Sequence, residues 1–484
     1  MDYKKKSLKK RIENILSVFG VSVFFLLVFS YSTSPFYPYS RGWDSAFFQL
    51  VGRGMTKGYL PYRDFFDMKG PWLFLIQYVG AYIGKYGIFL LQCIGLFLTL
   101  EFCLKCDYIF FPQSSLISVI LRLLPLGVIL AITMEGGNLT EEWSLPLLFL
   151  CFYLALQYIT GEKKEHKILW GFVYGIAFGI ISLIRITNTV LICAIALTVA
   201  ISLIKNRAWS NLIKNAIAFS MGIIISFSVP VLYFAANGIL GEMFYDTFIF
   251  GFIYGTEGFG YGTGKPLMLM LFLSVAMLII VKQKNKLLWL LAFFNMMGML
   301  ITLGMGNSTL HDYMLVIPGM MLGIWIWQRE VKELKIELWK KNIAILLLVI
   351  VSLYPCYKML YVTKTLFEQN SEKARIDYEN IIEIGAEISE KGTREMWGYE
   401  VPLRVYLISE IMPYNRYCGW QEHYMELVPS IEEDIITMFE EAPPRWIIKK
   451  TNKEILRVDI KEYIKEDYIE YKKNEDYTLY KYID

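Results

Sequence analysis

The chain alternates between long apolar runs and short loops that carry Lys and Arg. Most runs approach the length of about 20 residues that a helix needs to cross a bilayer core of about 30 Å. The pattern predicts an all-α membrane domain with about eleven spans. The spans are expected near residues 15–31, 86–104, 114–133, 141–159, 168–184, 187–204, 215–236, 265–281, 287–303, 313–327 and 342–360.

The basic loops predict the orientation, because Lys and Arg collect in loops that stay in the cytoplasm. Pairs of apolar runs separate these loops, so each pair must leave the cytoplasm and return. The first run lacks a small-residue cleavage site and is expected to remain as a span. The expected cytoplasmic loops are 1–14, 105–113, 160–167, 205–214, 282–286 and 328–341.

One apolar segment, Pro71 to Gly84, does not fit this alternation. Its length of about 14 residues is short for a span at 1.5 Å per residue. Counting it as a span would also place the later basic loops outside. We therefore expect a juxtamembrane or re-entrant helix within a first outer loop that extends from about Ser32 to Lys85. Long ordered loops usually carry function.

Beyond residue 360 the sequence becomes rich in Glu, Lys and Tyr, and no run is long enough to span a membrane. Alternating apolar positions at 445–449 and 468–483, with a helical stretch around 371–391, predict a small soluble α/β domain. The parity of the spans places this domain outside the cytoplasm. The expected domains are 1–360 and 361–484.

The composition excludes a soluble protein, since 55% of the residues are apolar and are concentrated in these runs. The net charge of +3 gives no sign of nucleic-acid binding, because the basic residues lie in short loops between spans and build no continuous face. The partner indicated at this level is the lipid bilayer of the cell membrane, which the chain crosses many times.

Polar residues that are costly near a membrane collect on the predicted outer side. Arg185 lies between apolar neighbours at the membrane face, where a charge costs about 2.5 kcal/mol or more unless it is paired or reaches the interface. It therefore needs an anion. Singly, Asp64 or Glu135 is more often a solvated loop acid, and His311 is equally often a satisfied interfacial histidine. The other candidates are Asp44, Arg63, Asp67, Lys69, Glu141, Glu142, Asp312 and Tyr313.

Lys69 directly precedes Gly70 and Pro71, where the short apolar segment begins. A proline in the first turn fits a helix start at this point. The N-terminus of a helix itself favours anions. Lys69 is therefore a second candidate anion binder.

These positions resemble the GT-C superfamily of membrane glycosyltransferases, in particular the dolichyl- or undecaprenyl-phosphate-mannose mannosyltransferase and aminoarabinose-transferase-like group, in a bacterial form. The resemblance covers about residues 15–330. Four features carry it, and the second is the most specific. They are Trp43-Asp44 after the first span, the Pro-Tyr-Arg-Asp…Asp-x-Lys-Gly-Pro segment at 61–71, the acidic patch from Asn138 to Glu142, and the His-x-Tyr…Pro pattern at 311–318.

The resemblance implies an enzyme that moves a sugar, with inversion, from a polyprenyl-phosphate donor to an acceptor outside the cytoplasm. It implies Asp44 as the catalytic acid, with Lys69, Arg185 and His311 as binders of the donor phosphate. Several members carry two successive acids, whereas Ser45 follows Asp44 here. No cofactor is certain, and a divalent metal ion stays open. Residues that would organise the loop, the acceptor or a metal are Arg63, Asp64, Asp67, Glu141, Glu142 and Tyr313.

The acceptor stays open between a glycan, a lipid and a protein, with a cell-surface glycopolymer favoured. A transporter or flippase of lipid-linked sugars is the alternative, but it would predict charges midway through spans and related halves. A polysaccharide polymerase or ligase would centre on arginines in a late loop, and the loop 237–264 has none. That loop is either a lid or aromatic platform for sugar or an unstructured connector. Its notable residues are Tyr245, Asp246, Tyr254, Glu257 and Tyr261.

Overall fold

A computed structural model of the chain is mostly helical and forms two compact units. It describes residues 2–256, 259–260, 262–280, 283–304, 306–330, 338–388 and 393–483. The first unit, here called the helical unit, comprises Met1–Ser30, Phe89–Ala236 and Gly255–Thr365. The second unit, here called the loop unit, comprises Tyr31–Ile88, Asn237–Tyr254 and Leu366–Asp484.

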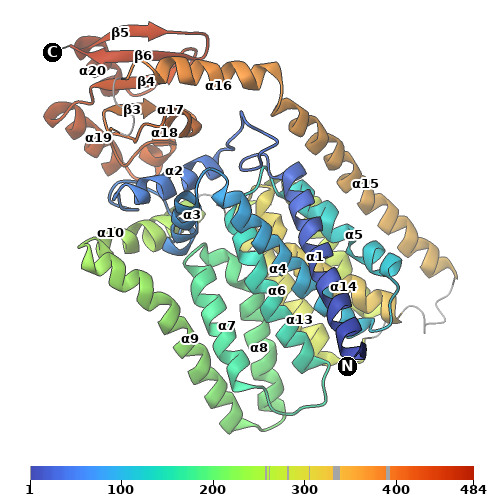
Figure 1. Cartoon of the computed structure of the whole chain (residues 1–484). Helices are drawn as coiled ribbons and strands as arrows, with labels where there is room; N and C mark the ends of the chain where they lie inside the picture. Colours follow the sequence, from blue (N-terminus) through green and yellow to red (C-terminus); the bar gives the residue numbers. More distant parts are fainter. Residues whose placement is uncertain are drawn as a thin grey trace. The chain divides into compact units, whose positions relative to one another are not determined.

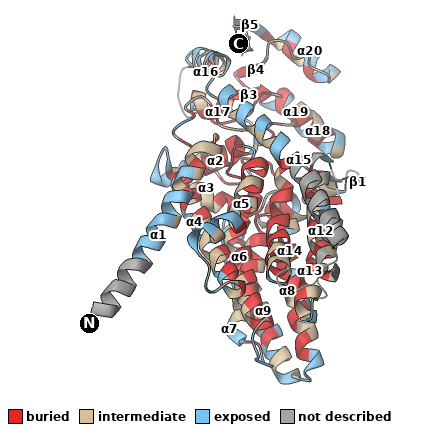
Figure 2. Cartoon of the chain, turned by 90° about the vertical axis from the view of Figure 1, so that its right-hand side faces the viewer, coloured by how far each residue is buried: buried red, intermediate tan, exposed pale blue. Residues whose placement is uncertain are grey.

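The helical unit consists of long apolar helices with short connections. Figure 2 shows buried residues concentrated on α6, α8 and α14, whereas the described part of α1 is mostly exposed or half-buried. The α-helices are α1 (Asp2–Phe29), α4 (Gly87–Phe110), α5 (Leu116–Thr133), α6 (Thr140–Ile159), α7 (Ile168–Ser182), α8 (Val190–Lys205), α9 (Trp209–Ala236), α12 (Lys265–Ile280), α13 (Lys286–Gly304), α14 (Ile317–Glu330) and α15 (Leu338–Glu368). The short elements are the 3₁₀ helices η1 (Ile186–Thr189), η3 (Gly262–Gly264) and η4 (His311–Val316) and the paired strands β1 (Phe259–Gly260) and β2 (Gly306–Asn307).

Each of the eleven apolar runs forms a helix over most of its length. The run at 187–204 is divided between η1 and α8, and the run at 313–327 between η4 and α14. Within the described residues, seven helical segments are long and apolar enough to cross a membrane, so the chain is an integral membrane protein. The predicted basic loops at 282–286 and 328–341 lie partly outside the described residues. The seven segments are Ile12–Phe29, Gly87–Phe110, Leu116–Thr133, Thr140–Ile159, Ile186–Lys205, Trp209–Ala236 and Lys286–Gly304.

Helices α7 and α9 pack backbone to backbone, and Figure 1 shows them as neighbours. A Cβ atom on Gly175 of α7 would lie 2.0 Å from the carbonyl oxygen of Phe219. A Cβ atom on Gly222 of α9 would lie 2.5 Å from the carbonyl oxygen of Phe172. Small residues bring membrane helices together in this way, because van der Waals packing replaces the hydrophobic effect between helices in lipid.

The loop unit combines three chain segments: the first loop, the segment Asn237–Tyr254 and the C-terminal segment. Helix α3 begins at Pro71, and Gly70 precedes it in an extended conformation, as the Gly-Pro pair predicts. The helices are α2 (Asp44–Thr56), α3 (Pro71–Ile83), α10 (Leu240–Phe244), the π-helix η2 (Tyr245–Phe250), α11 (Gly251–Gly255), α16 (Glu372–Gly385), α17 (Arg404–Ser409), α18 (Gln421–Leu427), α19 (Ser430–Glu441) and α20 (Val458–Asp467).

A small mixed sheet in the loop unit confirms the predicted C-terminal α/β fold. Its strands follow the order β3-β4-β6-β5, with β3 parallel to β4 and the other neighbours antiparallel. The alternation at 445–449 and 468–483 predicted three of the strands. The strands are β3 (Met396–Tyr399), β4 (Trp446–Lys450), β5 (Tyr468–Lys473) and β6 (Tyr477–Tyr482).

The core of the loop unit draws on all three of its chain segments. Phe66 of the first loop and Phe250 of η2 pack in one buried cluster with Trp397, Tyr424 and Ile435 of the C-terminal segment. The loop at 237–264 is helical from Leu240 to Gly255, so an unstructured connector is wrong for that stretch. Glu257 and Tyr261 lie outside the described residues. The first loop therefore folds together with the C-terminal segment.

Candidate active site

The segment at 61–71 folds onto itself through its own polar groups. Asp67 accepts a hydrogen bond from the backbone N–H of Lys69 at 2.6 Å, and Tyr62 donates its hydroxyl to the Lys69 carbonyl at 2.9 Å. Asp64 accepts from the backbone N–H of Leu60 at 2.7 Å. These bonds fix the turn that leads Lys69 into the start of α3.

Two arginines of the C-terminal segment hold this turn. Arg394 Nη1 lies 2.6 Å from Asp64 Oδ1, and the Phe66 N–H donates to the Arg416 carbonyl at 3.0 Å. Burial tends to raise the pKa of Asp64, but the Leu60 N–H, Arg63 and Arg394 lower it below its ordinary value. Asp64 is therefore an ionised anchor, and Arg63 is a half-exposed partner on its outer side.

The loop unit contains an acidic group formed by Asp44 and Asp67, and the cation Lys69 lies beside Asp67. Asp44 is half-buried at the start of α2, and no described residue donates a hydrogen bond to its carboxylate. Asp67 is 5% exposed. Burial raises its pKa to about 6 against the opposing effect of Lys69, and Asp44 raises it further. The two carboxylates therefore lie within electrostatic range of each other.

Asp246 extends this acidic group from the π-helix η2. It is 1% exposed, and Arg416 Nη2 lies 2.5 Å from its Oδ2. Burial raises its pKa to about 7, Arg416 opposes this shift, and Asp67 adds to it. Its other oxygen, Oδ1, is buried and has no hydrogen-bond partner among the described residues. The loop unit thus contains three carboxylates whose charges interact.

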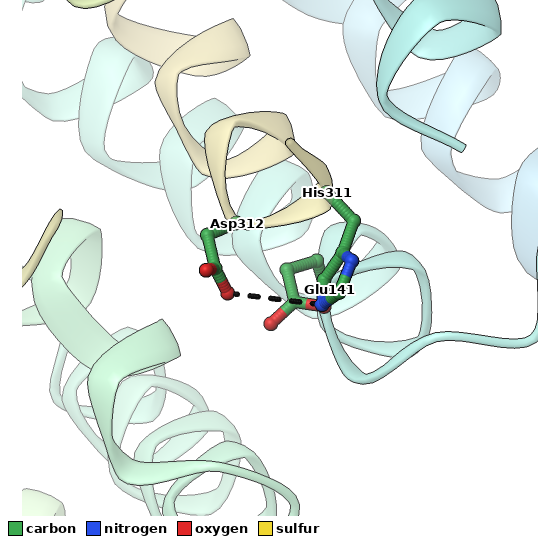
Figure 3. Close-up of side chains that lie close together, drawn as sticks. All are labelled: Glu141, His311 and Asp312. Carbon is green, nitrogen blue, oxygen red and sulfur yellow. Dashed lines mark ion pairs between the residues drawn. The ribbon is translucent and has the colours of Figure 1, made fainter. Parts of the chain in front are cut away.

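A second polar cluster lies in the helical unit around Arg185. Its Nη1 donates to Glu141 Oε1 at 2.7 Å and to Asp312 Oδ1. Figure 3 shows Glu141, His311 and Asp312 close together, with His311 Nε2 3.9 Å from Asp312 Oδ1. His311 Nδ1 lies 2.8 Å from Glu135 Oε2. The anion that Arg185 was expected to need is thus supplied, at least in part, by two carboxylates of the protein.

The ion pairs keep this cluster charged. Burial would raise the pKa of Asp312, but Arg185, His311 and the Thr309 N–H lower it to about 2. Burial would lower the pKa of Arg185, but Asp312 and Glu141 raise it above its ordinary value. With His311 neutral, the three acids and one arginine carry a formal charge of −2, which includes Glu135.

The same cluster offers a ligand set for a metal ion. One atom each from Glu141, His311 and Asp312 lies within 4.8 Å of the other two. An imidazole with carboxylates suits a divalent metal. However, Arg185 Nη1 is already bonded to an oxygen of each carboxylate, so a metal would have to share both with the guanidinium. Arg185 therefore fits as the cation of this cluster.

Glu142 and Tyr313 are not among these three ligands. Glu142 accepts hydrogen bonds from Gln92 at 2.9 and 3.0 Å and from the Asn138 N–H at 2.7 Å, inside the helical unit. Tyr313 is fully buried. Because successive residues of a helix point in different directions, Glu141 and Glu142 enter different surroundings.

The predicted site residues therefore fall into two sets. Five of them, Asp44, Arg63, Asp64, Asp67 and Lys69, lie in the loop unit, and the remainder lie in the helical unit. Sequence reasoning missed Arg394 and Arg416 and gave Asp246 no role. No motif or spacing marks these three residues, since their partners are far away in the sequence.

No protein-family model matches this chain, and no curated protein sequence matches it significantly. Solved structures do match. ArnT from Cupriavidus metallidurans bound to undecaprenyl phosphate aligns with a TM-score of 0.58 at 10% identity, covering 97% of this chain and 98% of that one. The same protein in the apo state gives a TM-score of 0.55 at 10% identity, with 98% of each chain covered. This chain therefore has the fold of ArnT.

The ArnT-like fold extends over nearly the whole chain, so the C-terminal sheet belongs to the matched architecture. The oligosaccharyltransferase of Archaeoglobus fulgidus, in a complex with Zn and sulfate, aligns at 11% identity over 90% of this chain and 68% of that one. Its TM-score of 0.42 is too low to support an argument.

The raised pKa of Asp67 predicts a pH dependence of stability. Between the ordinary value of 3.8 and about 6, the folded chain binds a proton that the unfolded chain does not. The resulting stability is complete below about pH 4 and is lost as the pH rises through 6. From pH 5 to 7.5 we expect the wild type to lose roughly 1 to 1.5 kcal/mol more stability than Asp67→Asn, since both proteins keep the contribution of Asp246.

Thermal unfolding of the purified protein in detergent, followed across this pH range, measures the difference. Asp459→Asn removes an exposed acid of α20 and should keep the wild-type slope. Identical slopes for the wild type and Asp67→Asn would show that Asp67 titrates normally.

Proposed function

We propose that this chain is an inverting glycosyltransferase that transfers a sugar from a polyprenyl phosphate to an acceptor outside the cytoplasm. The observation that carries the proposal is the environment of Asp44. It is a half-buried carboxylate without a hydrogen-bond donor among the described residues, within electrostatic range of Asp67 and in the same unit as Lys69. A general base must be free to accept a proton, and Asp44 meets that need.

The reaction follows from these groups. An acceptor hydroxyl attacks the anomeric carbon of the donor sugar, and its proton passes to Asp44. The bond between that carbon and the phosphate oxygen breaks, and its electron pair leaves with the polyprenyl phosphate. One displacement inverts the configuration at the anomeric carbon.

The leaving phosphate needs positive charge where its own charge develops. Lys69 lies two residues before Pro71, the first residue of α3, and a helix N-terminus favours an anion. The matched ArnT structure contains undecaprenyl phosphate, and a donor of that class fits a chain with the same fold. For the helical unit by itself, Arg185 and His311 remain a separate proposal as anion binders, and Arg185 Nε and Nη2 donate to no other described residue.

The topology supports an outer site. The eleven predicted spans, with their basic loops proposed to face the cytoplasm, support an extracytoplasmic side for the first loop, the loop before α12 and the C-terminal segment. A cell-surface glycopolymer is the proposed acceptor. The long apolar donor would remain in the lipid while its sugar reaches this side.

No step of this mechanism uses a metal ion, because Arg185 supplies the positive charge between Glu141 and Asp312. Treatment with EDTA should therefore leave sugar transfer within about twofold of the untreated rate, since the phosphate charge is stabilised by protein cations. Transfer is measured before and after chelation, with Mg²⁺, Mn²⁺ or Zn²⁺ added back. A loss that one of these ions restores would instead make the cluster a metal centre.

Replacing the base should stop the chemistry. We expect Asp44→Asn to lower transfer at least about 100-fold, because a general base contributes about 10²- to 10⁴-fold. The measurement is transfer of radiolabel from undecaprenyl-phosphate sugars in membranes that contain equal amounts of each variant. Asp459→Asn serves as the matched control at an exposed site. Wild-type rates in Asp44→Asn would remove Asp44 from the mechanism.

A further inference from the structure

A pocket of about 470 Å³ in the loop unit lies next to the acidic group but includes neither Asp44 nor Lys69. Its walls come from the first loop, from α10 and η2, and from the C-terminal segment, all within one compact unit. The side chains used below are Phe66, Glu242, Tyr245, Asp246, Arg416 and Tyr417, together with Asp434.

The deepest polar group of the pocket is incompletely bonded. Asp246 is 1% exposed, and Arg416 holds only its Oδ2. Asp246 Oδ1 and Arg416 Nε are both buried without hydrogen-bond partners among the described residues. Leaving a buried polar atom unsatisfied costs about 1–3 kcal/mol, and more for a charged group. A ligand with hydroxyl groups would satisfy both, since a hydroxyl donates to a carboxylate and accepts from a guanidinium.

The backbone at Asp246 is also unusual. Residues Tyr245–Phe250 form a π-helix, a rare conformation that is frequent at functional sites. It places Tyr245 at 38% exposure beside the buried Asp246. The segment therefore presents an aromatic ring and a carboxylate to the same pocket.

Aromatic rings form the apolar part of the wall. Phe66 and Tyr417 pack with ring centroids 5.2 Å apart, and the Arg416 guanidinium lies 4.9 Å from the Phe66 ring. Tyr417 donates its hydroxyl to Asp434 Oδ2 at 2.6 Å. The C–H faces of sugar rings pack on aromatic rings, while their hydroxyls bond to carboxylates and arginine.

The net charge of the pocket lining and its exposed edge restrict the class of ligand that the pocket can bind. Glu242, Asp246 and Asp434 oppose one Arg416, so the lining is formally −2 and disfavours a phosphorylated or acidic ligand. Ser430 and Asp434 are exposed, so the pocket meets water at that edge. A polymer in solution can enter there, whereas a polyprenyl donor is held in lipid.

We propose that this pocket binds a neutral or amine-bearing sugar unit of the acceptor glycan. The proposal rests on the glycosyltransferase function above and names its acceptor class. Asp67 interacts electrostatically both with Asp246 in the pocket and with Asp44. The charge of Asp67 raises the pKa of Asp246, and the charge of Asp44 raises the pKa of Asp67. The pocket and Asp44 lie in the same compact unit, and Phe66 of the pocket wall directly precedes Asp67.

Two substitutions at the open side of the pocket test this assignment. In Asp434→Asn and Tyr245→Ala, transfer of label from undecaprenyl-phosphate sugars to the acceptor in membranes should fall about tenfold or more, because contacts to a sugar are lost. The Kd of the purified full-length protein for undecaprenyl phosphate should stay within twofold. The matched controls, Asp459→Asn on α20 and Tyr471→Ala on β5, should change neither quantity.

Each of the other possible results would contradict a specific part of the proposal. Normal transfer in both variants would remove the pocket from acceptor binding, while leaving the glycosyltransferase function in place. Equal losses of transfer and undecaprenyl-phosphate binding would assign the pocket to the donor or to folding. A labelled product that protease digests would exclude a glycan acceptor. Absence of any transfer by the wild type would overturn the proposed function and this assignment with it.

Discussion

Arg416 is the residue on which the geometry of the loop unit depends. Its guanidinium pairs with Asp246, its carbonyl accepts the Phe66 N–H, and its planar group lies over the Phe66 ring. One residue thus connects the C-terminal segment to the first loop and to η2. Removing it would leave a carboxylate that is 1% exposed without its cation. Breaking a buried pair in this way costs roughly 3–5 kcal/mol.

Opposite physical effects determine the pKa values of the acids in the two clusters. In the loop unit, burial prevails and raises the pKa of Asp67 to about 6 and that of Asp246 to about 7. In the helical unit, Arg185 prevails and lowers the pKa of Asp312 to about 2. Groups that titrate near neutral pH are suited to proton transfer, whereas a permanently ionised pair is suited to holding helices together. The loop unit, which contains Asp44, is the proposed place of chemistry.

The sequence predicted those parts of the fold that depend on hydropathy. Each apolar run forms a helix because its side chains can be satisfied by lipid and neighbouring helices, and Pro71 marks the start of α3. The alternation at 468–483 predicted β5 and β6 in the same way. The helices at 240–255 were not predicted, because their short apolar stretches have no periodicity of useful length.

The candidate site could be predicted only as a list of residues. Asp44, Asp67 and Lys69 were marked by their position in one loop, and Arg185 by the cost of its charge. Their partners were not predictable, because Asp64 meets Arg394 across 330 residues and Asp246 meets Arg416 across 170. Such pairs follow from tertiary packing, which a single sequence does not reveal. The roles of all these residues in catalysis remain proposals.

The most direct measurement reconstitutes the purified protein in liposomes with a labelled undecaprenyl-phosphate sugar and an acceptor-containing membrane extract. It follows two quantities, the release of undecaprenyl phosphate and the leaflet in which intact donor resides. A glycosyltransferase releases undecaprenyl phosphate and moves the label to the acceptor, and this is the expected result. Intact donor that changes leaflet without cleavage would contradict the account and identify the chain as a transporter of lipid-linked sugars.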